Sequence, residues 1–113
     1  LNQGTKLFGV YENDNLIGIV KCVLNNEYIY FSRLSVLPQY QGKGIATSLV
    51  KHLEDYAMEN NVFVSKCKVR KSEKSNIALY SKLGYDIVKE EMIVNKNGDE
   101  IPTITMSKNL NPK

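Results

Sequence analysis

The alternation of apolar and polar residues predicts three strands in the first third of the chain. Runs rich in apolar, β-branched and aromatic residues span 7–11, 16–24 and 28–36, and clusters of Asn, Asp and Glu separate them. Strands joined by such short turns form an antiparallel meander. We expect Pro38 to end the third strand, because proline has no N–H to donate to a strand ladder.

The period then changes from two residues to between three and four. Over residues 44–60 the apolar positions recur at helical spacing, which predicts an amphipathic helix. Polar residues such as Glu54 and Asp55 are expected to cover much of the rest of its surface. The apolar stripe consists of Ile45, Leu49, Leu53, Tyr56 and Ala57.

The second half of the chain predicts a strand at 62–69 and a short helix at 76–83. Ser72 is a plausible N-cap of this helix, and Gly84 fits its C-terminal cap. Strands at 85–94 and 101–106 are expected to form a hairpin across 95–98, since Asn97-Gly98 favours a tight turn. The order β-β-β-α-β-α-β-β indicates an α/β (α+β) fold. Its mixed, mostly antiparallel central sheet carries packed helices in a single domain, residues 1–113.

Composition agrees with one ordinary globular domain of 113 residues, with 42% hydrophobic and 24% charged residues. The net charge of +3 is too small to argue for a nucleic-acid partner. Apolar runs fall short of the ~18 residues of a membrane span, and no signal peptide opens the chain, so no membrane partner is expected. A basic cluster at 66–74 is most simply a solvated face.

Two features bear on the protein's setting. Cys22 and Cys67 lie far apart without metal-ligand neighbours, so no metal site is expected. Two buried, reduced thiols predict a reducing, cytoplasmic location. The chain begins at Leu1 rather than Met and enters a strand almost at once, so we expect that a preceding segment is missing.

Residues 39–47, which read Gln-Tyr-Gln-Gly-Lys-Gly-Ile-Ala-Thr, are the most informative segment. Glycines between a strand and a helix leave backbone N–H groups open at the helix N-terminus, where a phosphate can bind. A Walker A loop is excluded, because the required spacing before Gly-Lys-Ser/Thr is absent. A dinucleotide fingerprint fits poorly, because Thr47 stands where a third glycine is needed. Gln-x-x-Gly-x-Gly, which binds pyrophosphate without metal, fits best.

This segment, together with residues 34–38 before it, resembles the cofactor motif of the GNAT superfamily of acetyl-CoA-dependent N-acyltransferases. Residues 76–85, Asn-Ile-Ala-Leu-Tyr-Ser-Lys-Leu-Gly-Tyr, are similar to that family's second signature. The order of elements also agrees, from the family's second strand to its last. The family's first strand and the helices after it are the elements without a counterpart here.

The resemblance implies acetyl-CoA as co-substrate and assigns roles to individual residues. Leu34 and Val36 would lie on the strand that binds the pantetheine arm, and Asn76 would hold that arm. Tyr80, one helical turn from Asn76, would protonate the leaving thiolate, because a phenol stays protonated at neutral pH. A backbone N–H near Val36 would steady the oxyanion. The pyrophosphate would be surrounded by N–H groups of Gln41, Gly42, Lys43, Gly44, Ala46 and Thr47.

The general base is where the sequence departs from many relatives. A glutamate often stands where Ser32 is found, or near Tyr28, and neither position carries a carboxylate. Glu27 is one residue off, which turns its side chain to the opposite face of a strand. His52 lies at the edge of the apolar helix stripe and is better explained as a helix residue than as a base. We therefore assign no base.

The leading prediction is an N-acetyltransferase that transfers an acetyl group to a primary amine of a small molecule or a protein. The alternatives are a non-catalytic acyl-CoA-binding or regulatory module, and a protein that binds another nucleotide. The acceptor amine cannot be read from the sequence. Oligomeric state is also open, with a homodimer as one expectation because an unpaired edge strand invites pairing.

Overall fold

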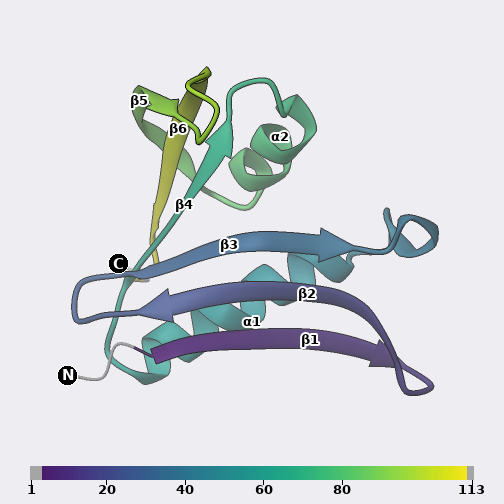
Figure 1. Cartoon of the computed structure of the whole chain (residues 1–113). Coiled ribbons are helices and arrows are strands. Elements are labelled where there is room, and N and C mark those ends of the chain that lie inside the picture. Colours follow the sequence, from purple (N-terminus) through teal and green to yellow (C-terminus); the bar gives the residue numbers. More distant parts are fainter. Residues whose placement is uncertain (1–3, 112–113) are drawn as a thin grey trace. The chain divides into compact units, whose positions relative to one another are not determined.

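The computed structural model describes residues 4–111, which form a mixed α/β architecture with mostly antiparallel strands (Figure 1). This confirms the predicted fold class and the predicted order of elements. A short 3₁₀ turn, η1, precedes the first helix. The elements are β1 (Gly4–Glu12), β2 (Asn15–Leu24), β3 (Ile29–Val36), η1 (Pro38–Tyr40), α1 (Ile45–Glu59), β4 (Val64–Arg70), α2 (Lys74–Lys82), β5 (Asp86–Val94) and β6 (Glu100–Asn109).

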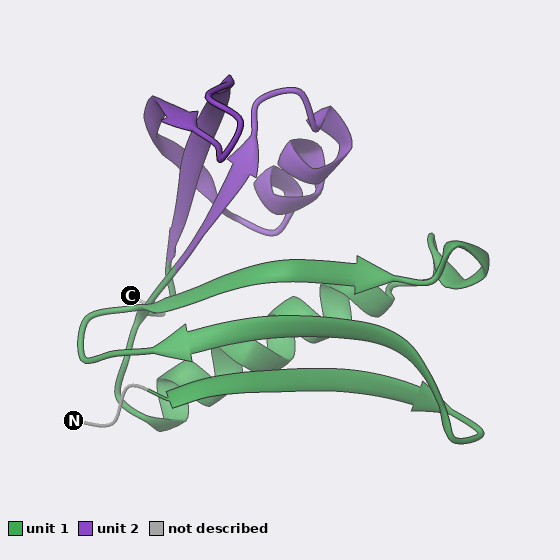
Figure 2. Ribbon diagram, viewed as in Figure 1, with its two compact units in different colours: residues 1–65, 109–113 green, residues 66–108 purple. Residues whose placement is uncertain are grey.

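The chain divides into two compact units, coloured separately in Figure 2. Unit 1 comprises residues 1–65 and 109–113, and unit 2 comprises residues 66–108. Within the described residues, unit 1 holds β1, β2, β3, η1 and α1, while unit 2 holds α2, β5, β6 and most of β4.

Unit 1 is an antiparallel meander of β1, β2 and β3 with α1 packed against it (Figure 1). The predicted apolar stripe of α1 faces these strands, and Leu49, Leu53 and Ala57 are buried. They pack in a core with buried strand residues such as Val20 and Phe31. Unit 1 therefore fixes the position of the α1 N-terminus against the ends of β2 and β3.

Unit 2 has the strand order β4-β6-β5 and carries α2. The predicted hairpin is confirmed, and its loop spans residues 95–99, one residue longer than the predicted 95–98. Asn95 organises this loop, because its side-chain oxygen accepts hydrogen bonds from the N–H groups of Asn97 and Asp99. Gly98 takes a φ of 83°, which only glycine adopts easily.

The predicted cap of the second helix was wrong. Glu73, not Ser72, is the N-cap of α2, and it makes no side-chain cap bond. The Lys74 N–H donates to the Ser72 carbonyl at 3.0 Å, and the Glu73 N–H donates to the Arg70 carbonyl at 2.9 Å. Because this tight turn occupies Ser72, the helix begins at Lys74, two residues earlier than the apolar pattern predicts.

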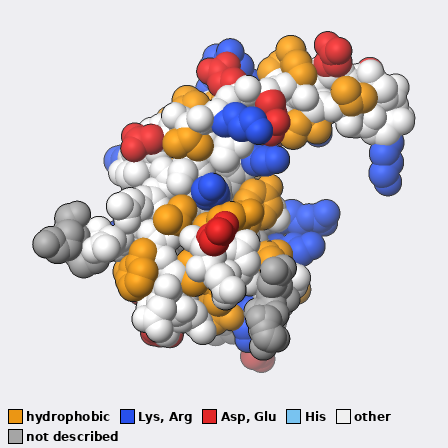
Figure 3. Space-filling view, turned by 90° about the vertical axis from the view of Figure 1, so that its left-hand side faces the viewer, with side chains coloured by type: hydrophobic (Ala, Val, Ile, Leu, Met, Phe, Trp, Pro, Cys, Tyr) orange, Lys and Arg blue, Asp and Glu red, His pale blue; other side chains and the backbone are white. Residues whose placement is uncertain are grey.

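The surface mixes charges of both signs. Figure 3 shows acidic, basic and hydrophobic side chains interspersed on the face that it presents. Within residues 4–111, neither helix has the length and apolar character needed to cross a membrane. The same residues contain no group of three or more His, Cys, Asp or Glu side chains that could hold a metal ion.

Candidate functional site

The turn between β3 and α1 adopts the glycine-dependent conformation that its sequence predicts. Gly42 and Gly44 both have a φ of 82°, in the left-handed region that strains any residue with a Cβ atom. Among the described residues, no heavy atom beyond the glycine itself and its two chain neighbours lies within 4 Å of a Cβ placed at either position. The turn therefore leaves open space beside both glycines, where a ligand can approach the backbone.

The N-terminus of α1 carries open hydrogen-bond donors. Gly44 is its N-cap, no side chain caps it, and its first turn contains no acidic residue. The first helical hydrogen bond runs from the Ser48 N–H to the Gly44 carbonyl at 3.0 Å. In the part of the chain that the structure describes, the N–H groups of residues 42–47 have no acceptor. These donors and the helix dipole together favour an anion.

Gln41 differs from the other five residues assigned to the pyrophosphate. Its backbone N–H already donates to the Pro38 carbonyl at 3.2 Å, within the 3₁₀ turn. Its side-chain Nε2 donates to the Val36 carbonyl at 3.0 Å. The structure thus shows Gln41 bracing the turn, and a direct contact with phosphate stays a prediction.

A second brace joins the turn to the far end of β1. The Tyr40 hydroxyl donates to Oε2 of Glu12 at 3.1 Å. This bond to the carboxylate, reinforced by the carboxylate charge, raises the pKa of the Tyr40 phenol. The two residues are 28 positions apart, so no local pattern in the sequence could have revealed the contact.

Strand β3 contains a bulge just before the turn. Ile19 pairs with Ser35 while Lys21 pairs with Ser32, so β3 holds one extra residue, and Arg33 there has a φ of 55°. Such a bulge re-aims the residues that follow it. Beyond it, the Leu37 N–H bonds to the Ile17 carbonyl on β2. Because backbone groups alternate along a strand, the N–H of Val36 points away from β2.

Helix α2 carries the other two predicted residues, Asn76 and Tyr80, which lie one turn apart. The Asn76 Nδ2 donates to Oε1 of Glu73 at 2.7 Å. Tyr80 is only 5% exposed, and its ring lies 6.1 Å from that of Tyr85 between centroids. Tyr85 is likewise buried.

The surroundings of Tyr80 keep its hydroxyl protonated. Burial raises the pKa of this phenol above its ordinary value, and the nearby Cys67 and Glu73 raise it further. Burial also raises the pKa of the Cys67 thiol to about 12, so that group is neutral as well. Tyr80 is therefore a phenol that can donate a proton and does not ionise at physiological pH.

The structure reveals no general base at or near positions 28 and 32. Ser32 lies on β3, and the N–H groups of Glu27 and Tyr28 both donate to the side-chain oxygen of Asn25 in the preceding turn. His52 is exposed and packs edge-to-face against Phe8, with ring centroids 4.6 Å apart. This packing agrees with the interpretation of His52 as a helix surface residue.

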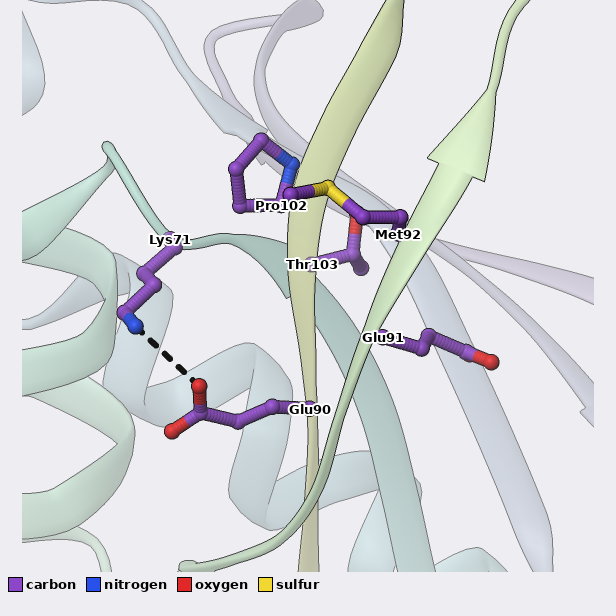
Figure 4. Close-up of a pocket in the computed structure, with 6 residues that line it drawn as sticks. All are labelled: Lys71, Glu90, Glu91, Met92, Pro102 and Thr103. Carbon is purple, nitrogen blue, oxygen red and sulfur yellow. Dashed lines mark hydrogen bonds and ion pairs between the residues drawn. The ribbon is translucent and has the colours of Figure 1, made fainter.

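Unit 2 also contains a pocket of about 220 Å³ between the β5–β6 hairpin and the end of β4 (Figure 4). Lys71 points toward Glu90 across it, with 3.1 Å between Nζ and Oε1. Glu91, at its edge, pairs with Lys68 at 3.4 Å and with Lys89 at 3.3 Å. Two lysines of the predicted basic cluster are therefore neutralised by glutamates of β5.

The predicted site residues fall into two groups. Those from Leu34 to Thr47 lie together in unit 1, on β3, the turn and the first turn of α1. Asn76 and Tyr80 lie together in unit 2, on one face of α2. The first group can bind an anion, and the second offers a protonated phenol.

Comparison with known proteins gives this geometry a context. Residues 1–85 match the model described as the acetyltransferase (GNAT) family. Among curated proteins, none matches this sequence.

Solved structures share the fold. The ribosomal-protein-S18-alanine N-acetyltransferase from Escherichia coli is 22% identical with a TM-score of 0.82, over 96% of this chain and 71% of that chain. A GNAT family acetyltransferase from Elizabethkingia anophelis, with acetyl-CoA bound, is 21% identical with a TM-score of 0.80, over 94% and 76%. Arabidopsis thaliana Naa50, in complex with a bisubstrate analogue, is 25% identical with a TM-score of 0.80, over 90% and 71%.

Proposed function

Because the chain belongs to the acetyltransferase (GNAT) family, we propose that it transfers the acetyl group of acetyl-CoA directly to a primary amine. The acceptor is an amine of a small molecule or of a protein. Two buried, unbridged thiols support a reducing compartment, the cytoplasm, as the place where the protein acts.

One observation carries the proposal: α1 begins with open amides and no capping side chain, directly after two glycines at φ 82°. Such an N-terminus fits the diphosphate of coenzyme A, because its donors and dipole match two adjacent negative charges. In the proposed complex, the amides of Gly42, Lys43, Gly44, Ala46 and Thr47 hold the diphosphate. Gln41 braces the turn, and Leu34 and Val36 line the path of the pantetheine arm.

The chemistry proposed for the remaining residues follows from their protonation states and backbone directions. The amine must be neutral to attack the thioester carbonyl. The Val36 N–H, which points away from β2, donates to the oxygen that becomes negative during the attack. Asn76 holds the pantetheine arm. The amine nitrogen bonds to the carbonyl carbon and loses its extra proton to solvent. The carbon–sulfur bond then breaks, and Tyr80, kept protonated by burial, gives its proton to the departing sulfur and regains one from solvent.

The direct test is calorimetric titration with acetyl-CoA, followed by a thiol-release assay over a panel of amines. We expect saturable binding of acetyl-CoA, and release of the CoA thiol only when a suitable amine is present. ATP and NAD serve as controls, and neither should compete. Failure to bind acetyl-CoA, or binding of ATP or NAD that CoA does not displace, would overturn the proposal.

A second candidate function is a non-catalytic acyl-CoA-binding module. The observation in its favour is the lack of a carboxylate at Tyr28 and Ser32, which leaves no assigned base to deprotonate the incoming ammonium. The same two measurements separate the candidates. Tight binding of acetyl-CoA without thiol release across the amine panel would favour the module, whereas amine-dependent release would establish the enzyme.

A further inference from the structure

Gly18, on β2, lies directly under the first turn of α1. A Cβ atom at this position would lie 2.9 Å from Cγ2 of Ile45 and 3.3 Å from Cδ1 of Leu49. Carbon atoms in ordinary contact are about 3.5–4.0 Å apart. The helix therefore approaches the strand more closely at this point than any residue with a side chain would allow.

The atom that a Cβ would meet cannot easily move aside. Cγ2 of Ile45 is attached directly to the β-carbon, so it moves only if χ1 or the backbone changes, and β-branched side chains are stiff at χ1. Ile45 is also the first residue of α1 and directly follows Gly44. A side chain at position 18 would thus displace the helix backbone itself, together with the open amides beside it.

We propose that Gly18 is a positioning residue for the diphosphate. By lacking a side chain, it sets the distance of the α1 N-terminus from the sheet and so the placement of the N–H groups of residues 42–47. This inference rests on the proposed function, because it assumes that these amides hold the diphosphate of acetyl-CoA. Gly18 itself touches no ligand in this account.

The chain offers a matched control in Gly9, on β1. A Cβ at Gly9 would lie 2.7 Å from Cδ1 of Leu16, an even shorter distance. That atom, however, is the flexible end of a side chain that is 41% exposed, so it can swing into solvent. Gly9→Ala therefore makes the same change in a neighbouring strand without pressing on α1.

The experiment compares two acetyl donors, acetyl-CoA and S-acetylpantetheine, which lacks the diphosphate. For Gly18→Ala we expect the KM for acetyl-CoA to rise about tenfold, since misplacing a binding group by about 1 Å can cost on the order of 100-fold. The kcat at saturation and the kinetics with S-acetylpantetheine should stay close to those of the wild type. Gly9→Ala should match the wild type with both donors.

A double variant provides the rescue. Ile45→Ala removes Cγ2, so Gly18→Ala combined with Ile45→Ala should recover most of the affinity for acetyl-CoA that Gly18→Ala loses, as expected for two residues in contact. An equal loss with both donors, or no loss at all, would overturn the inference. The same would follow if the double variant were no better than Gly18→Ala.

Failure of the proposed function would look different. In that case the wild type itself would show no preference for acetyl-CoA over S-acetylpantetheine, or would transfer from neither donor. The outcomes given above refute the positioning role of Gly18 only when the wild type itself prefers acetyl-CoA over S-acetylpantetheine.

Discussion

The two α-helices within residues 4–111, α1 and α2, begin in opposite ways. Neither α1 nor α2 has a side-chain cap bond at its N-terminus. At α1 the N-cap is Gly44 and Gly42 lies just before it, and the first turn carries no acidic side chain, as at α2. At α2 the N-cap is Glu73, whose carboxylate accepts a hydrogen bond from Asn76 at 2.7 Å.

This difference separates a helix end that can take up an anion from one that already has a carboxylate. Both N-termini carry the partial positive charge of a helix dipole. At α2, Glu73 places a negative charge of the protein's own beside that end. At α1, open amides and glycines without side chains leave the partial positive charge of the helix N-terminus accessible to an anionic ligand. An uncapped helix is thus informative only together with its neighbouring residues.

The strongest test of this contrast is to put a carboxylate at α1 as well. Gly44→Glu should lower the affinity for CoA by more than about 100-fold, because a carboxylate beside the diphosphate repels it and fills the approach to the backbone. The left-handed φ should also cost about 1–2 kcal/mol of folding stability. Calorimetry with CoA and thermal unfolding measure the two effects separately.

Gly98→Glu is the matched control. Gly98 has a φ of 83° and open space around it, as Gly44 does, but it lies in the β5–β6 loop. The control should lose a similar amount of stability and keep the affinity of the wild type for CoA. If both variants weakened CoA binding alike, the loss would reflect strain rather than the loss of an anion site.

The next test concerns α2, whose contribution should be chemical. Tyr80→Phe should lower kcat by about 100-fold, as expected for loss of a general acid, and leave the KM for acetyl-CoA within about threefold. Steady-state kinetics with a fixed amine measure both values. Turnover equal to the wild type would remove Tyr80 from the mechanism, and a change confined to KM would make it a binding residue.

The same comparison shows which features a sequence can reveal. α1 was expected over residues 44–60 and observed at Ile45–Glu59, because a long apolar stripe and a glycine turn are local signals. The predicted N-cap of α2 was wrong, because backbone hydrogen bonds hold Ser72 in a turn. The identity of the Ser72 side chain gives no sign of these bonds. Glu54, expected on the polar side of α1, is 4% exposed.

Features that depend on distant residues had no signal at all. The bulge in β3 puts Arg33, which is not a glycine, at a φ of 55°, and nothing in the local sequence marks it. The Tyr40–Glu12 hydrogen bond and the closeness of Gly18 to Ile45 both arise from packing between separate elements. The candidate site could therefore be located from its motif, but its bracing could not.

A third prediction uses the buried thiol near Tyr80. The pKa of Cys67 is raised from 9.0 to about 12, so the unfolded chain releases this proton first as the pH rises. The stabilisation is complete below about pH 9 and declines above it, by about 2 kcal/mol between pH 9 and pH 10.5. Cys67→Ala should remove this part of the alkaline loss in urea unfolding. Identical pH profiles of the two proteins would contradict it.

The smallest expected effect is at Lys43. Its side chain is exposed, so the loss of one charge near the phosphates should weaken CoA binding only about threefold, and less at high salt. Calorimetry of Lys43→Ala at low and high ionic strength would measure this. A loss comparable to that of Gly44→Glu would mean that a side chain, rather than the backbone, holds the anion.

The most direct test of the central claim is an NMR titration with CoA that follows individual backbone amides. We predict large shifts and slowed hydrogen exchange for the N–H groups of Gly42, Lys43, Gly44, Ala46 and Thr47, and no change at Gly98. Binding of CoA that left these five amides unperturbed would contradict the account.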